Sequence, residues 1–480
     1  MRKQDYLSEL IQSLSPGEKR YFKIYAGLQP GAKRYMKLYD LLEKEGSYDA
    51  AVLSRKLKSD PKKLAHEKDY LQQVLIRALR NFEQDSSVPT VLLHRYLEAD
   101  MLSKRGLKDF ALSHIDKAYK KILDHEQHAT FIHAFMLRQR LVHNKVDPSP
   151  EFGSYELYKQ QMDQHNEIME LEFLYAELIP HMVRRNDKEA MKTIAQKGPL
   201  RKKPEELLSA RARIIYYTAH IAITTILYGL GTALGYAEQL VTTYEENPFL
   251  IQNNPVGYLY SYHRLSVAYS YEEGDRALEA LDKALAIADR KAFPLPSKIL
   301  NQFRFDTLLQ KLNLLNGLYR YHKSVDVARE ILHHELDPEQ EYKRITVIFL
   351  YTVALLFTGG GEQALVPLRE LLKGNKKGRQ DIQLKAMQLE LLVHYDLGNY
   401  SLIPYQVQSI KKWVKRKGLE AESCALYLTW MLRLSSTGSN GDQKKELMAF
   451  SEDVNAGKIK IETGIINLRY WLDEKIKRLR

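Results

Sequence analysis

Apolar residues recur along most of this chain at the spacing of one helix face, and small residues hold regular places among them. Residues 99–118 show the pattern, since Ala99 and Leu102 share one face of a first predicted helix and Gly106 marks a turn. The second predicted helix carries Ala111, Ile115 and Ala118 on one face. Two antiparallel helices approach closely only where small residues face the partner, so this stretch predicts a helical hairpin.

The second-helix pattern recurs six more times toward the C-terminus. The further sets of anchor residues are Ala190 and Ile194; Ala233, Ala237 and Leu240; Ala277, Leu281 and Ala284; Ser324, Ala328 and Ile331; Ala364, Leu368 and Leu371; and Ile403, Val407 and Ile410. From Ala190 onward the first anchors are 43, 44, 47, 40 and 39 residues apart. The longer interval between Ala111 and Ala190 leaves room for one degenerate hairpin over residues 130–177.

The spacing of Ala111, Ile115 and Ala118 resembles the A-x3-F-x2-A half of the tetratricopeptide consensus. The resemblance implies an all-α fold, in which hairpins stack into a right-handed α-α superhelix. The period of about 40 residues exceeds the usual 34, and the consensus Trp and terminal Pro are missing. The chain is therefore more similar to the long-helix repeats of bacterial regulators and assembly proteins.

Residues 1–87 are predicted to form a separate helical module that does not follow the repeat. Expected helices cover residues 5–14, 21–25, 32–44, 49–58 and 60–82. Ser15 and Glu18 have the spacing of a capping box, with Pro16 in the first turn, and Ser47 is the expected cap of the helix over 49–58. The blocks LSPGEKRYFKIYA and KRYMKLYDLLEKEGSYD look like the N-terminal region of uncharacterised bacterial tetratricopeptide proteins.

We expect the repeats to occupy residues 88–460 and an amphipathic helix to close the array within residues 461–480. The last predicted helix, over residues 464–479, has an apolar stripe formed by Ile465, Leu468, Leu472, Ile476 and Leu479. A solenoid needs such a helix to cover the exposed end of its core. The alternative is a basic amphipathic helix that binds a membrane surface or a partner.

One segment is long enough to be tested as a membrane span, because no charged residue lies between Arg213 and Glu238. Tyrosines, threonines and a histidine lower the hydrophobicity of this segment, and Gly229 and Gly231 interrupt it. The anchors Ala233 and Ala237 also fall within it. These features favour a buried repeat hairpin and predict no membrane span. The first residues lack the apolar core of a signal peptide, so we expect a cytoplasmic protein.

Motifs for catalysis or cofactor binding are not found in the sequence. It contains no phosphate-binding loop, zinc-protease helix or nucleophile elbow, and we expect no cofactor, no metal and no enzymatic activity. His125 and His128 have the spacing of metal ligands on a helix, but interhelical hydrogen bonding is favoured for them. Cys424, the only cysteine, excludes an intramolecular disulfide and is expected to be a buried thiol.

The leading hypothesis is a non-catalytic scaffold that binds a protein or peptide on the concave face of the solenoid. By analogy with the tetratricopeptide family, the first-helix positions that face this groove are Tyr96, Asp100, Lys104, Arg264, Tyr271, Lys385, Gln388 and Tyr395. Aromatic residues beside cations suit an acidic or C-terminal peptide segment. The net charge of +12 also favours an acidic partner.

The alternative is a nucleic-acid-binding regulator, in which residues 1–87 contact DNA and the repeats sense a partner. This module has 17 lysines and arginines against 12 aspartates and glutamates. A short helix, a turn and a longer helix over residues 49–81 are similar to a helix-turn-helix, although several acidic residues lie among the basic ones.

Overall fold

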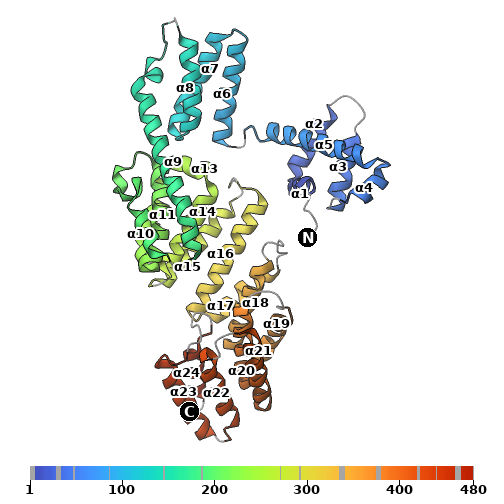
Figure 1. Cartoon of the computed structure of the whole chain (residues 1–480), viewed down its shortest axis with the longest axis vertical. Helices are drawn as coiled ribbons and strands as arrows, with labels where there is room; N and C mark the ends of the chain where they lie inside the picture. Colours follow the sequence, from blue (N-terminus) through green and yellow to red (C-terminus); the bar gives the residue numbers. More distant parts are fainter. Residues whose placement is uncertain are drawn as a thin grey trace. The chain divides into compact units, whose positions relative to one another are not determined.

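The computed structural model describes residues 6–28, 34–46, 49–85, 87–143, 146–184, 187–270, 272–290, 293, 295–333, 341–374, 380–418, 422–438, 440–459 and 466–478. Helices and turns, without strands, make up this described part of the chain (Figure 1), so the predicted all-α class is confirmed. The chain divides into two compact units. The first comprises residues 1–268 with 291–299, and the second comprises residues 269–290 with 300–480.

Five helices at the N-terminus surround one small core. They are α1 (Tyr6–Ser13), α2 (Pro16–Gly27), α3 (Arg34–Glu45), α4 (Ala50–Leu57) and α5 (Pro61–Phe82). Their fully buried side chains include Leu7, Phe22, Tyr39 and Leu71, which lie on the inward faces of α1, α2, α3 and α5. All five helices were predicted from the sequence, four of them at closely similar bounds, whereas α2 extends well beyond the predicted residues 21–25.

The ends of these helices are set by local hydrogen bonds. The predicted capping box at α2 is confirmed, because Glu18 N donates to Ser15 Oγ at 3.3 Å and Ser15 N donates to the Glu18 carboxylate at 2.6 Å. The N-cap residue predicted for α4 was wrong. Asp49, rather than Ser47, is its N-cap, since Asp49 directly precedes the helix and accepts from the N–H groups of Ala51 and Val52. Ser47 itself lies outside the described residues.

Nine further helices are described in the first unit, which includes all of them except the last residue of α14. They are α6 (Val88–Lys104), α7 (Lys108–Asp124), α8 (His128–Val142), α9 (Tyr155–Arg184), α10 (Lys188–Ala195), α11 (Ala210–Tyr228), α12 (Leu234–Glu246), α13 (Pro248–Asn253) and α14 (Pro255–Tyr269). Short 3-10 turns lie between them: η1 (Pro150–Gly153), η2 (Gly198–Arg201), η3 (Pro204–Glu206) and η4 (Leu230–Ala233). The predicted boundary between residues 87 and 88 falls between α5 and α6, where Ser87 is the N-cap of α6.

The α6–α7 hairpin has the geometry that its sequence predicts (Figure 1). Gly106 has a φ of +81°, a conformation that side chains disfavour. Gly106 N donates to Ser103 O at 2.9 Å, and Leu107 N donates to Leu102 O at 3.1 Å. This pair of bonds is a Schellman ending, which closes α6 and reverses the chain into α7.

A buried arginine joins α7, α8 and the loop before η1. The Arg138 side chain is fully buried and donates to Asp116 at 2.8 Å, to Asp147 at 2.7 Å and to the carbonyl of Ser149 at 2.8 Å. Burial raises the pKa of Asp116, whereas the hydrogen bond from Arg138 lowers the pKa of Asp147, which is nearer to solvent. These hydrogen bonds of Arg138 hold the loop before η1 in place, since that loop has few apolar side chains to bury.

The hairpin predicted over residues 213–238 is also confirmed. α11 ends at Gly229, whose φ is +106°, and α12 follows after η4. Ala212, Ile215, Ala219 and Ile223 of α11 are buried among neighbouring helices. None of the helices in the described chain combines the length and apolarity that crossing a membrane requires.

The second unit continues the alternation of helices. It holds α15 (Gly274–Ala288), α16 (Ser297–Gly317), α17 (Tyr321–His333), α18 (Glu341–Phe357), α19 (Gly361–Gly374), α20 (Gln380–Asp396), η5 (Tyr400–Leu402), α21 (Ile403–Lys417), α22 (Glu422–Ser436), α23 (Asn440–Asn455) and α24 (Leu468–Arg478), apart from the first three residues of α16. Each second-helix anchor predicted from the sequence, in both units, is buried except Ala190, which is half-buried. The repeat pattern therefore does mark the buried faces of helices.

The C-terminal helix α24 lies across the ends of three earlier hairpins of the second unit. The Tyr470 ring stacks on Tyr319, in the α16–α17 turn, at 5.5 Å between ring centroids, and lies 5.5 Å from Phe357 at the end of α18. Trp471 Nε1 donates to Asp396, the last residue of α20, at 3.0 Å, and Lys475 pairs with the same carboxylate at 2.7 Å. Hence α24 covers a row of turns as well as packing on α23.

The stripe predicted for this last helix is only partly described. Leu468 and Leu472 are buried and Ile476 packs against the core, whereas Ile465 and Leu479 lie outside the described residues. The helix begins at Leu468 rather than near residue 464.

Candidate partner-binding site

Three of the predicted groove residues lie together on α6 in the first unit. Tyr96 is half-buried, and its ring lies 5.6 Å from the ring of His133 on α8. Asp100 and Lys104 form an ion pair at 2.5 Å on the helix surface. Such a pair within one exposed helix turn contributes only about 0.3–0.5 kcal/mol, so a partner can displace it at little cost.

Arg264 and Tyr271 were predicted for a second groove segment. Arg264 is half-buried on α14. Burial raises the pKa of the Tyr244 phenol to about 12, and the nearby charge of Arg264 partly opposes this rise. Among the described residues, no hydrogen bond or ion pair joins Arg264 to the α6 group. Tyr271 lies outside the described residues.

The remaining predicted groove residues belong to α20 in the second unit. Lys385 is half-buried, but the side chains of Gln388 and Tyr395 are only 5% and 4% exposed. The carbonyl of Gln388 accepts a hydrogen bond from the Tyr427 hydroxyl at 2.8 Å, and the Tyr395 ring lies 5.4 Å from that of Trp471. The structure therefore gives these two side chains internal packing contacts.

A cavity of about 400 Å³ in the first unit was not predicted from the sequence. Its apolar lining consists of Pro89, Ile214, Ile215 and Leu250. Its uncharged polar lining consists of Gln127, Tyr244, Asn253 and Asn254. Glu172 and Arg211 add one charge of each sign. Five helices and two turns supply these residues, which explains why no local motif indicates the cavity.

The α7–α8 turn fixes one wall of this cavity. Glu126 has a φ of +49°, and its carboxylate accepts from the N–H groups of Ala210 and Arg211, each at 2.9 Å. Ser209 Oγ accepts from the next N–H group, that of Ala212, at 3.1 Å. The first backbone donors of α11 are thus satisfied within the protein, and the backbone of Arg211 is held in place.

Asn253 and Asn254 fix the opposite wall at the end of α13. Asn253 Nδ2 donates to the carbonyl of His125 at 3.1 Å, while Asn254 caps the N–H group of Gly257 at 2.8 Å. The Oδ1 atom of Asn253 is buried and has no hydrogen-bond partner among the described residues. An acceptor left in that state costs about 1–3 kcal/mol.

The charged side chains at the rim of the cavity are not neutralised internally. Arg211 and Glu172 are both exposed, and neither forms an ion pair within the described part of the chain. A larger open depression of about 780 Å³ beside η2 differs in this respect. There the buried Glu167 is bound by Lys202 and by the N–H group of Leu208, each at 2.7 Å, so its charge is already compensated.

The two histidines at metal-ligand spacing have structural contacts, and the interhelical hydrogen bond favoured from the sequence is found for His128. His125 lies in the α7–α8 turn and His128 begins α8, so the expectation that they share one helix was wrong. His128 is buried and bonds through Nδ1 to Gln161 Oε1 of α9 at 2.7 Å. Burial lowers the pKa of both imidazoles. Over the residues that the structure describes, no three His, Cys, Asp or Glu side chains are grouped as metal ligands.

Cys424 is buried in α22, as expected, and burial raises the pKa of its thiol. Trp413, in a basic run of α21, is also buried in the core of the second unit.

No family model matches the chain, and neither a curated protein nor a solved structure matches it.

Proposed function

We propose that this protein is a non-catalytic scaffold, and that its first unit binds a peptide segment of a partner in the 400 Å³ cavity. The volume lies in the range of ligand-binding clefts and is far too small for a folded domain. The proposal includes a tetratricopeptide-like superhelical arrangement of the hairpins, which the buried small-residue anchors support.

The lining of the cavity carries the proposal. A peptide presents one amide donor and one carbonyl acceptor per residue, and the side-chain amides of Gln127, Asn253 and Asn254 offer both kinds of group. The apolar wall formed by Ile214, Ile215 and Leu250 accommodates one aliphatic side chain.

The rim adds a preference for charge. Arg211 is exposed and has no ion pair in the described part, so an acidic side chain of the peptide can pair with its guanidinium. Arginine forms two parallel hydrogen bonds to a carboxylate, which adds orientation to attraction. We therefore expect peptides with an aliphatic residue close to an aspartate or glutamate.

A random peptide library displayed on phage and panned on the full-length protein tests the proposal. Selected peptides are then measured by fluorescence anisotropy against the wild type and the Arg211→Ala variant. Loss of a charge-assisted hydrogen bond costs about 1.5–3 kcal/mol, so we expect affinity to fall at least tenfold. Only the Arg211 side chain is removed, and its backbone bond to Glu126 persists, so the variant should fold.

Arg201→Ala is the matched control. Arg201 is also exposed and lines the open depression beside η2, so its loss removes the same charge from another hollow. Unchanged affinity is expected for this variant. Equal weakening by both substitutions, or no peptide enriched over an empty support, contradicts the proposed site.

A further inference from the structure

The N-terminal module has one surface where six lysines and arginines form no internal ion pairs among the described residues. It is formed by α4, the turn at residues 58–60 and α5, which we call the α4–α5 surface. Arg55, Lys58, Lys62, Lys63, Arg77 and Arg80 are all exposed there. None of these six forms an ion pair within the part of the chain that the structure describes.

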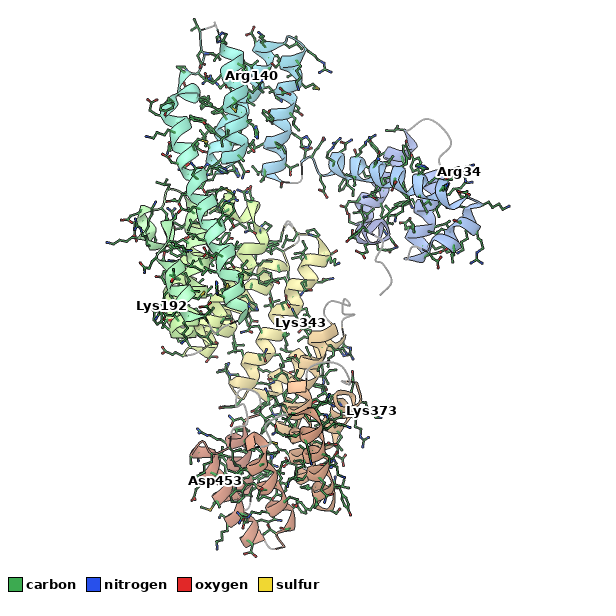
Figure 2. The ribbon with its side chains drawn as sticks, viewed as in Figure 1. Arg34, Arg140, Lys192, Lys343, Lys373 and Asp453 are labelled. Carbon is green, nitrogen blue, oxygen red and sulfur yellow. The ribbon has the colours of Figure 1, made fainter. Side chains whose placement is uncertain are left out.

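Most acidic residues of the same segment already form hydrogen bonds or ion pairs within the protein. Asp49 and Asp60 accept backbone N–H groups as the N-caps of α4 and α5. Glu67 pairs with Arg34 of α3 at 2.9 Å, and Arg34 lies at the edge of the module (Figure 2). Glu45 pairs with Lys56. Among the described residues from 49 to 82, Asp69 is the one carboxylate that is exposed and has neither a hydrogen bond nor an ion pair. The surface therefore keeps a strong positive potential.

This segment has the helix order and the short turn of a helix-turn-helix. α4 has 8 residues and α5 has 22, and both pack on α3. The turn between them is short, because Lys58 adopts φ +48° and Ser59 N donates back to Ser54 O at 3.0 Å. Helix pairs joined by three or four residues place their second helix in the major groove of DNA.

The outward face of α5 has the residues that such a helix needs. Lys62, His66, Gln73, Arg77 and Arg80 are exposed and follow one another at spacings of four, seven, four and three, which keeps them on one side. The opposite side is buried through Leu64, Leu71, Val74, Leu75 and Ala78. Lysine and arginine bind phosphates, and glutamine can bind the edge of adenine through two hydrogen bonds.

We propose that the α4–α5 surface binds double-stranded DNA, with the outward face of α5 in the major groove and the flanking cations on phosphates. This function is separate from peptide binding in the cavity. The remaining charge of Asp69 fits the same position, because a carboxylate accepts a hydrogen bond from cytosine N4.

The test measures fluorescence anisotropy of a labelled duplex of about 30 base pairs, roughly three helical turns, against the full-length protein at several salt concentrations. The variant carries Lys62→Gln, Lys63→Gln and Arg77→Gln. Each lost phosphate contact removes about 0.9 from the slope of log affinity against log salt, so we expect a slope shallower by about 2 to 3. Glutamine favours helices, so α5 should persist.

The matched control carries Lys412→Gln, Lys415→Gln and Arg416→Gln on α21, three exposed cations of the second unit. It has the same change in net charge, and we expect its DNA affinity and slope to equal those of the wild type. Gln73→Ala is expected to lower affinity for sequences selected from a random duplex pool without changing the slope. The proposal is overturned if no duplex binds at low salt or if the control variant loses as much affinity.

Double-stranded RNA tests where α5 lies. The deep, narrow major groove of A-form RNA does not admit a helix, so we expect weaker binding to an RNA duplex of the same length. Equal affinity for RNA and DNA would refute the placement in the major groove. Arg211→Ala should keep full DNA affinity, so failure of peptide binding and failure of DNA binding are distinguishable.

Discussion

Replacement of Trp471 by alanine should destabilise the ends of three hairpins that are remote from it in sequence. Trp471 is 2% exposed, contacts Tyr395 and donates from Nε1 to Asp396. Truncation of a buried tryptophan to alanine costs about 3–5 kcal/mol, and the lost hydrogen bond to a carboxylate adds to this figure. We expect at least about 4 kcal/mol of lost stability in the second unit.

Trp471→Phe separates the two contributions. Phenylalanine keeps a ring beside Tyr395 but cannot donate to Asp396, which would retain its pair with Lys475. The expected loss is about 1.5–3 kcal/mol, the contribution of a hydrogen bond to a charged group. The difference between the two variants then reports the packing of the six-membered aromatic ring that both tryptophan and phenylalanine carry.

Hydrogen exchange read by mass spectrometry is the suitable assay, because it resolves local opening along the chain. In Trp471→Ala, exchange should accelerate in the turns at residues 318–320, 358–360 and 397–399, as well as in α23 and α24. The reasoning is refuted if the loss is below about 1 kcal/mol, or if faster exchange is confined to α23 and α24.

Four further substitutions test local interactions of the first unit. Arg138→Met leaves the carboxylates of Asp116 and Asp147 without their buried cation, and urea unfolding should show a loss of about 3–5 kcal/mol. Because Arg138 lowers the pKa of Asp147, that carboxylate stabilises the fold above about pH 4 and the contribution is lost as pH falls through its native pKa. The Tm difference between wild type and Asp147→Asn should therefore shrink in acid; a difference independent of pH contradicts this. Gly106→Ala, at φ +81°, should cost about 1–2 kcal/mol in denaturant unfolding, whereas Gly235→Ala, inside α12 with open space around it, should stabilise by up to about 1 kcal/mol.

The features predicted correctly from the sequence depend on residues close together in the chain. The capping box at Ser15 and the turn at Gly106 each involve groups within a few residues. The small-residue anchors follow from helix periodicity, and their burial in the structure reflects the same close approach of neighbouring helices. Local geometry is enough to define such elements.

The cavity could not be predicted, because its lining comes from residues between Pro89 and Asn254 on separate helices. No spacing within one helix indicates that Gln127, Arg211 and Asn253 meet. Glu126, which positions α11 through a carboxylate placed in a turn of positive φ, also leaves no recognisable pattern in the sequence.

The prediction that Gln388 and Tyr395 face a groove was made by analogy with tetratricopeptide repeats, whose first helices line a concave face. The structure buries residues around most of this helix: Ile382, Ala386, Gln388, Leu389, Leu391, Leu392, Val393, His394 and Tyr395. A helix that is apolar on nearly every side lies between other elements. The consecutive apolar residues Leu391, Leu392 and Val393 were therefore the signal that α20 has no wide groove face.

The same burial explains why α24 matters to the second unit. In an ideal solenoid each hairpin contacts only its neighbours, so the ends of the array can open independently of its middle. Here Tyr470 and Trp471 contact the ends of α16–α17, α18 and α20 at once. A hairpin that opens must therefore break contacts to α24 as well as to its neighbours. We expect the second unit to unfold more cooperatively than a solenoid of the same length, and Trp471→Ala should remove that added cooperativity.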